Sequence, residues 1–161
     1  MRIFARRATG PAMPAAGTVR APRLFRAMNS SRGTMMGDAI WLTRSSAERR
    51  RGLLGIDRLA GGEGLWIDPC EGVHTFGMRF TIDVIFLAGN HTVVKTVTML
   101  PPRRISVCWR AKSLLELPAG TIDRCCVKPG DIIEITLPDA PRSMRRGRAI
   151  DISDNADSGS L

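Results

Sequence analysis

Residues 82–87 read Ile-Asp-Val-Ile-Phe-Leu, and after Ala-Gly-Asn-His a second apolar run, Thr-Val-Val-Lys-Thr-Val-Thr-Met, covers residues 92–99. Both runs are short and rich in β-branched residues, which favours strands. Gly89 and Asn90 tolerate positive φ, so they predict a hairpin with a two-residue loop. In that register Phe86 lies opposite Val93, Val84 opposite Lys95, and Asp83 opposite Thr96.

Four further segments have the same composition and are separated by Gly, Pro and Asn. They predict strands at residues 39–43, 64–67, 114–117 and 132–137. The last segment alternates between apolar and polar residues, so Ile133, Ile135 and Leu137 should face inward. Together the segments predict a mainly β domain, an antiparallel β-sandwich or small barrel with one short N-terminal helix.

The helix is indicated by Ser45-Ser-Ala-Glu48, in which the serine oxygen and the glutamate can each satisfy a free backbone amide. The pattern predicts a helix that continues to Leu54 and stops at Gly55, because glycine readily ends a helix in the left-handed conformation. A second short turn is expected at Thr121, with Asp123 near its positive end.

The charge distribution separates a basic N-terminus from a nearly neutral domain. The 161-residue chain carries a formal charge of +9, but residues 1–37 hold seven arginines and no acidic residue, and the rest has 17 basic and 15 acidic residues. We therefore expect a disordered basic extension at 1–36, one β domain at 37–138 and a disordered tail at 139–161. A nucleic-acid surface needs cations gathered on the folded domain, so nucleic acid is an unlikely partner here.

No apolar run approaches the roughly 20 residues of a membrane span, and the N-terminus lacks the apolar core of a secretory signal. Its arginine-rich, acid-free composition resembles a transit peptide, while Met28, Met35 and Met36 offer later start sites. We expect a cytoplasmic protein with no membrane span.

The four cysteines include no Cys-x-x-Cys pair, and His74 and His91 are the only two histidines. Cys70, His74 and Cys108 are weak candidates for metal ligands, but structural zinc sites usually contain two closely spaced ligand pairs. We expect no metal, no cofactor and free thiols in a reducing compartment. In an oxidising compartment, a Cys70–Cys108 disulfide is the alternative. A catalytic Cys70–His74 pair would lack a third group to orient the histidine.

Two carboxylates, Asp83 and Glu116, stand inside apolar runs, where a charge needs a partner. As structural ions they would pair with Arg79 or Arg49. For Asp83 the hairpin register selects Thr96, and His74 or a loop amide are the other expected partners. As functional groups they would line a pocket, for which the ligand-binding candidates are His74, Met78, Arg79, Asp83 and Glu116.

The chain resembles domain-of-unknown-function family 192 over roughly residues 39–137. The resemblance rests on Glu48-Arg-x-x-Gly-Leu-Leu54, on Phe76-x-Met78, on Ile82-Asp-Val-Ile-Phe86, and on Leu115-Glu-Leu-Pro-Ala-Gly120 followed by Gly130-Asp131. It implies a β-sandwich-like domain of this length in a prokaryotic family without an established activity. Gly77 stands where many members have tryptophan, and an asparagine that often precedes the aspartate is missing here.

Three functions are compatible with these observations. The favoured hypothesis is a non-catalytic binding or accessory domain for a small polar ligand or a peptide. The alternative is a small hydrolase or lyase that uses Asp83 and Glu116 as an acid/base pair, with one carboxyl held protonated. The third is weak nucleic-acid binding through the basic N-terminal tail.

Overall fold

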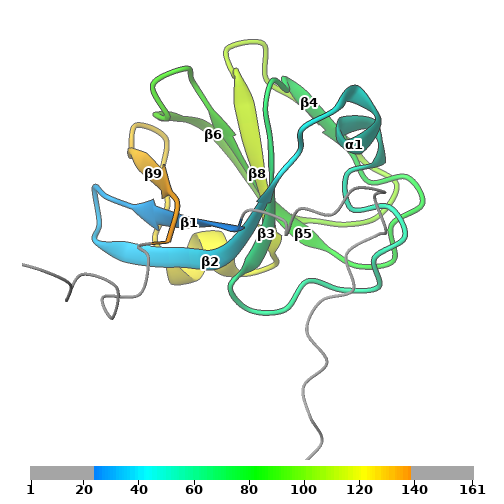
Figure 1. The fold of residues 1–161 in the computed structure, drawn as a ribbon, viewed down its shortest axis with the longest axis horizontal. Coiled ribbons are helices and arrows are strands. Elements are labelled where there is room, and N and C mark those ends of the chain that lie inside the picture. The colour runs from blue at the N-terminus through cyan, green and yellow to red at the C-terminus, as the bar shows by residue number, and fades with distance from the viewer. Residues whose placement is uncertain (1–23, 139–161) are drawn as a thin grey trace, which may run out of the picture.

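The fold is that of a computed structural model, which describes residues 24–138 (Figure 1). This part of the chain consists of nine strands and two short helices. In chain order they are β1 (Leu24–Asn29), β2 (Thr34–Leu42), α1 (Ser46–Arg51), β3 (Glu63–Ile67), β4 (Gly72–His74), β5 (Ile82–Leu87), β6 (Val93–Leu100), β7 (Ile105–Val107), β8 (Ser113–Pro118), α2 (Thr121–Arg124) and β9 (Ile133–Thr136).

Seven strands form one curled sheet in the order β6-β5-β8-β3-β2-β1-β9, while β4 and β7 form a separate two-stranded sheet. The end strands of the seven-stranded sheet, β6 and β9, approach each other where they begin. A bridge joins Thr92 to Ile132, and the Val93 amide donates to the Asp131 carbonyl at 2.8 Å. The fold is therefore a mainly β half-barrel, as the sequence predicted. One pair, β2 with β3, is parallel, whereas all other neighbours are antiparallel.

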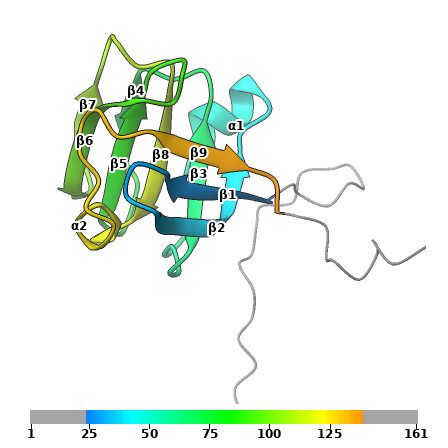
Figure 2. The ribbon, with the colours of Figure 1, turned by 90° about the vertical axis from the view of Figure 1, so that its left-hand side faces the viewer.

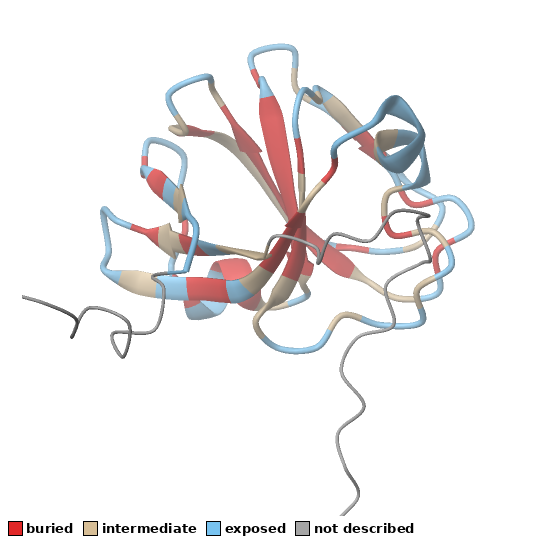
Figure 3. Ribbon diagram, in the orientation of Figure 1, coloured by how far each residue is buried: buried red, intermediate tan, exposed pale blue. Residues whose placement is uncertain are grey.

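The curled sheet has an apolar layer on each face, which explains why β5 is buried along its whole length. Inside the curl, Ile85 and Leu87 meet residues from both ends of the sheet, and Ile122 of α2 packs against them. On the outer face, Val84 and Phe86 pack with residues that include Leu53, which follows α1, and Val73 of the small sheet. Figure 3 shows this buried central sheet and the exposed surface of α1.

The folded part begins earlier than predicted. Strand β1 and the start of β2 occupy residues that we assigned to a disordered extension, so that prediction is wrong for residues 24–36. β1 pairs with β2 on one side and with β9 on the other (Figure 2). The pairing with β2 has two register shifts, and the extra residues lie in β2, whereas β1 pairs with β9 in an unbroken register. The remaining residues of the two predicted disordered segments, 1–23 and 139–161, lie outside the described part.

The β5–β6 hairpin forms, but its predicted register is wrong. Phe86 lies opposite Lys95, Val84 opposite Val97, and Ile85 rather than Asp83 opposite Thr96. The reason is a longer loop closed by the Ala88 amide on the Thr92 carbonyl, together with two irregularities in β6. The positive φ falls on His91, at 62°, and not on Gly89.

The helix signals are confirmed at the start of α1 and corrected at its end. Ser45 and Glu48 form the predicted capping box, but the helix ends at Arg51 with Gly52 as its C-cap. The turn at Thr121 forms α2. Strands β4 and β7 were not predicted, because each has only three residues. In β9, Ile133 is buried as predicted, whereas Leu137 lies beyond the strand and is half exposed.

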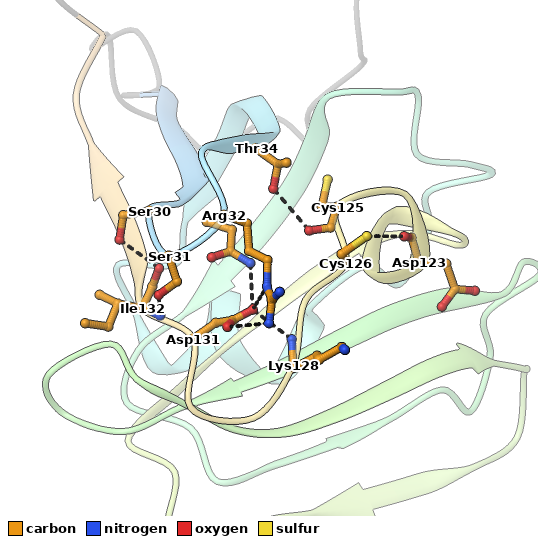
Figure 4. A network of polar contacts seen from close by, with 11 residues as sticks. Ser30, Ser31, Arg32, Thr34, Asp123, Cys125, Cys126, Lys128, Asp131 and Ile132 are labelled. Carbon is orange, nitrogen blue, oxygen red and sulfur yellow. Dashed lines mark hydrogen bonds and ion pairs between the residues drawn. The ribbon is translucent and has the colours of Figure 1, made fainter.

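A polar cluster ties the first hairpin to the loop before β9 (Figure 4). The Asp131 carboxylate accepts hydrogen bonds from the side chains of Asn29 and Arg32 and from the Lys128 amide, at 2.9 to 3.2 Å. Donors of this strength, above all the Arg32 guanidinium, lower the pKa of Asp131 to about 2. We call Asn29, Arg32, Lys128 and Asp131 the clasp, because they join segments about a hundred residues apart.

Candidate ligand-binding pocket

The two buried carboxylates lie on neighbouring strands but on opposite faces of the sheet. Val84 is opposite Glu116, and Asp83 is opposite Leu117. Directly paired residues share a face and consecutive residues alternate between faces. Asp83 therefore points into the curl, and Glu116 points to the outer layer. The structure does not bring these two carboxylates together in one pocket.

Asp83 is fully buried and bound by two backbone amides. One carboxylate oxygen accepts from the Met99 amide at 2.9 Å, and the other accepts from the Ile122 amide at 2.8 Å. Met99 belongs to the irregular part of β6 and has φ 53°, and Ile122 belongs to α2. The sequence predicted Arg79, Thr96, His74 or a loop amide as the partner; the two donors are backbone amides, but of β6 and α2 rather than of a loop, and the choice of Thr96 is wrong. Asp83 thus links β5 to β6 and α2.

Glu116 is almost equally buried but lacks such partners. The residue is 3 % exposed, and its Oε2 atom makes no hydrogen bond within residues 24–138. Burial disfavours the charged form and raises the pKa of this carboxyl to about 8. At pH 7 the group is mostly protonated, and it can both donate and accept a hydrogen bond.

Glu116 lines a pocket of about 520 Å³ between α1 and the strands beneath it. The walls are largely apolar, and polar groups of α1 stand at one side. The lining residues are Ser46, Arg49, Arg50, Arg51, Gly52, Leu53, Leu54, Ile67, Pro69, Cys70, Gly72, Val73, His74, Met78 and Glu116. A pocket of this size with apolar walls and few polar groups is typical of small-molecule sites.

The pocket exists because α1 cannot pack closely on the sheet. The helix reads Ser-Ala-Glu-Arg-Arg-Arg and has no buried residue, so Leu53 is the nearest side chain that anchors it. Gly52, with φ 50°, carries the backbone over the carboxyl: a methyl group here would lie 3.9 Å from Glu116 Oε2. Glycine is favoured here because a side chain resists this positive φ.

Cys70 and His74 line the pocket but do not form a reactive pair. The Cys70 thiol donates to the Gly72 carbonyl at 3.0 Å, and burial raises the pKa of the thiol, which disfavours a thiolate. His74 is exposed and lies beside the Phe76 ring. All four cysteines are free thiols, and residues 24–138 contain no cluster of three potential metal ligands.

The structure thus brings together three of the five predicted ligand-binding residues, His74, Met78 and Glu116. Arg79 lies outside the pocket, where it forms an exposed ion pair of 3.2 Å with Asp57. Cys108, the remaining metal candidate, is also outside. Sequence reasoning named Arg49 only as an ion partner and did not place Gly52 in the site, because the predicted helix ran on to Leu54 whereas α1 ends at Arg51.

Comparisons with known proteins identify the family. The sequence model of DUF192, described as "Uncharacterized ACR", matches residues 28–135, so the chain belongs to this family of unknown function. A segment of 63 residues is 46 % identical to the UPF0127 protein PF1050 of Pyrococcus furiosus, and it covers 38 % of this chain and 53 % of that protein. The match therefore spans about half the length of that relative.

Two solved structures have the same fold. A protein of Sinorhizobium meliloti 1021, provisionally called a transcription regulator, superposes with a TM-score of 0.63 at 24 % identity, over 74 % of this chain and 98 % of the other. A protein of unknown function from Novosphingobium aromaticivorans DSM 12444 gives 0.61 at 21 % identity, over 76 % and 99 %. At this identity the likeness concerns the fold alone. No helix among residues 24–138 is long and apolar enough to cross a bilayer.

Proposed function

We propose that this DUF192 domain is a non-catalytic binding domain, whose pocket beneath α1 holds a small polar ligand through Glu116. One observation carries the proposal: a nearly fully buried carboxyl faces the pocket with its Oε2 unpartnered among the described residues. A buried polar atom without a hydrogen bond costs roughly 1–3 kcal/mol. A ligand that supplies the missing hydrogen bond recovers this cost, and that makes the site a favourable place for binding.

The lining suggests the chemistry of the ligand. A protonated Glu116 favours an uncharged polar group, such as a carbonyl, amide or hydroxyl, at the inner end. Leu53, Ile67 and Val73 favour an apolar middle. Arg49 and its two neighbours on α1 favour an anionic group at the outer end, since guanidinium groups bind carboxylates and phosphates well. We therefore propose a small organic anion with an uncharged polar end.

The separation of Asp83 and Glu116 supports binding over catalysis. The acid/base hypothesis requires both carboxyls at one reacting bond, but they lie on opposite faces of the sheet. Cys70, the other reactive side chain in the pocket, has a raised pKa. Binding of nucleic acid through the N-terminal tail stays a prediction, and its test should remove residues 1–23 only, because β1 starts at Leu24.

A thermal-shift screen of small carboxylates and phosphorylated compounds on the full chain at pH 6.5 tests the proposal. A ligand that binds the native state raises the Tm. We expect hits whose shift disappears in Glu116→Leu and in Leu54→Trp, which fills the pocket, but persists in Glu134→Leu, a change on the exposed face of β9. The proposal fails if no compound shifts the wild type, or if both pocket variants respond as the wild type does.

A further inference from the structure

The small sheet leaves one face uncovered. Gly72 pairs with Val107 and His74 pairs with Ile105, so these four residues share a face. Val73 and Ser106, which alternate with them, are buried and point toward the core. Ile105 is 65 % exposed and Trp109, two residues beyond the strand, is 81 % exposed. These are large apolar side chains on an open surface.

The exposed apolar residues lie along the two neighbouring chain segments of this sheet and just beyond its ends. The Cys108 amide donates to the Glu71 carbonyl at 2.8 Å, so the two chain segments stay side by side beyond the end of the strands. At the other end, the half-exposed Phe76 lies beside His74, with 6.0 Å between ring centroids. We call Phe76, Ile105, Val107 and Trp109 the apolar row. Exposed apolar side chains of this kind mark interaction surfaces.

The segment that carries β7 has only positive charges, and exposed Glu71, beside Cys108, is an acidic residue next to the row. Residues 84–115 contain no aspartate or glutamate but include Lys95, Arg103, Arg104, Arg110 and Lys112. Among residues 24–138 the two ion pairs are Arg32–Asp131 and Arg79–Asp57, so four of these five cations, all except Lys95, are exposed without a carboxylate partner. Cations therefore predominate around the row, which favours an anionic partner.

The edge of β7 is not available for an added strand. The ammonium group of Lys95 donates to the Ser106 hydroxyl and to the Val107 carbonyl, both at 3.0 Å. An extended acidic peptide that paired with this edge would have to displace both bonds. The partner must instead accept side chains that project from the face of the sheet.

We propose that the apolar row docks this protein peripherally on an anionic lipid bilayer, a role beyond that of the pocket. Trp109, Ile105 and Phe76 enter the interfacial region, where tryptophan and aliphatic side chains are favoured. Arg103, Arg104 and Arg110 remain at the headgroups and bind lipid phosphates. A bilayer adapts its surface to projecting side chains, whereas a folded partner would need a groove shaped to receive them.

Sedimentation of the full chain with extruded vesicles tests this proposal. The vesicles contain phosphatidylcholine alone or an equal mixture with phosphatidylglycerol, at low and high NaCl. We expect binding to the anionic mixture only. Trp109→Ser/Ile105→Ser should weaken it at least ten-fold, and Arg103→Gln/Arg104→Gln by up to about thirty-fold at low salt. The matched controls Met35→Ser/Leu137→Ser and Arg44→Gln/Arg58→Gln change exposed side chains elsewhere and should bind within two-fold of the wild type.

Three outcomes overturn the proposal. The wild type could show no preference for anionic vesicles. The apolar-row variant could bind as the wild type does, which would assign the attraction to cations elsewhere, including the basic N-terminus. Poly-glutamate could bind in place of vesicles and lose affinity in the same variants, which would make the partner an acidic polypeptide. If the double variant fails to fold by circular dichroism, Trp109→Ser alone, at the most exposed position, decides between these outcomes.

Discussion

Asp83 and Glu116 are both acidic, both almost completely buried, and lie on strands that are hydrogen-bonded to each other. Inside the curl, Asp83 has a backbone amide on each of its oxygens. On the outer face, Glu116 faces a pocket and has an oxygen without a partner among the described residues. The comparison shows that burial alone does not decide whether the fold satisfies a carboxylate. The number of donors that the fold supplies does.

The largest effect is expected from removing the structural carboxylate. Asp83→Ala leaves the Ile122 amide buried and the Met99 amide part-buried without an acceptor, and a fully buried donor left this way costs roughly 1–3 kcal/mol. We expect a loss of about 3–4 kcal/mol in the free energy of unfolding, measured by urea denaturation. The control Asp123→Ala, at an exposed position of α2, should change it by less than about 0.5 kcal/mol. A fully stable Asp83→Ala variant would remove the distinction between the two carboxylates.

The Glu116→Gln substitution tests the same comparison through the pH dependence of stability. The raised pKa means that only the folded state holds the proton between pH 4.5 and about 8. The wild type should therefore lose stability as pH rises through this window, at up to about 1.4 kcal/mol per pH unit. Glutamine removes the titration, so the variant should gain about 3 kcal/mol relative to the wild type between pH 4.5 and 7. Parallel pH profiles of Tm for the two proteins would contradict the assignment.

Asp131, the acid of the clasp, should show the opposite dependence on pH. Its lowered pKa means that its contribution is present above about pH 3.8 and is lost as pH falls toward 2. Asp131→Asn should cost about 1–2 kcal/mol at pH 7, since half-exposed Arg32 lets water screen the pair. The difference from the wild type should shrink below pH 3.8. A difference that is constant from pH 2 to 7 would show that the charge of Asp131 is unimportant.

The smallest effect concerns the turn that sets the register of β5 and so the face on which Asp83 lies. At Gly89 the nearest atom to an added Cβ is 3.7 Å away, and the residue does not have positive φ. Gly89→Val should therefore change stability by less than about 0.5 kcal/mol. His91→Val should cost about 1–2 kcal/mol, because a β-branched residue resists its φ of 62°. If Gly89→Val has the larger effect in thermal melts, the described turn is wrong.

Local chemistry was enough to predict much of the fold. A short run rich in β-branched residues located β5, a period-two pattern located β9, and Ser45 with Glu48 located the start of α1. The patterns failed where backbone irregularities interrupt them. Extra residues in β2 shift its register with β1, and extra residues in β6 together with the longer loop at His91 changed the hairpin register. Strand β1 itself was missed because its residues were grouped with the arginine-rich, acid-free N-terminus. A single sequence does not reveal a bulge, because the extra residue has no distinctive type.

The site could be predicted only in part, for a different reason. Asp83 and Glu116 were identified as anomalies within apolar runs, and both are buried. Whether they share a pocket depends on strand order and alternation, and β8 was not known to lie beside β5. Arg79 was expected in the site because it is close in sequence to Asp83, but it points away to Asp57.

The position of β1 between β2 and β9 has a consequence for how the chain folds during synthesis. Residues 133–136 are among the last of the domain to leave the ribosome, yet they cover the edge of the first strand. Until then β1 presents unpaired amide and carbonyl groups, a template for wrong pairing between nascent chains. Contacts that span about a hundred residues also slow folding. We therefore expect substitutions in β9 to increase aggregation during expression, by more than the short length of this strand would suggest.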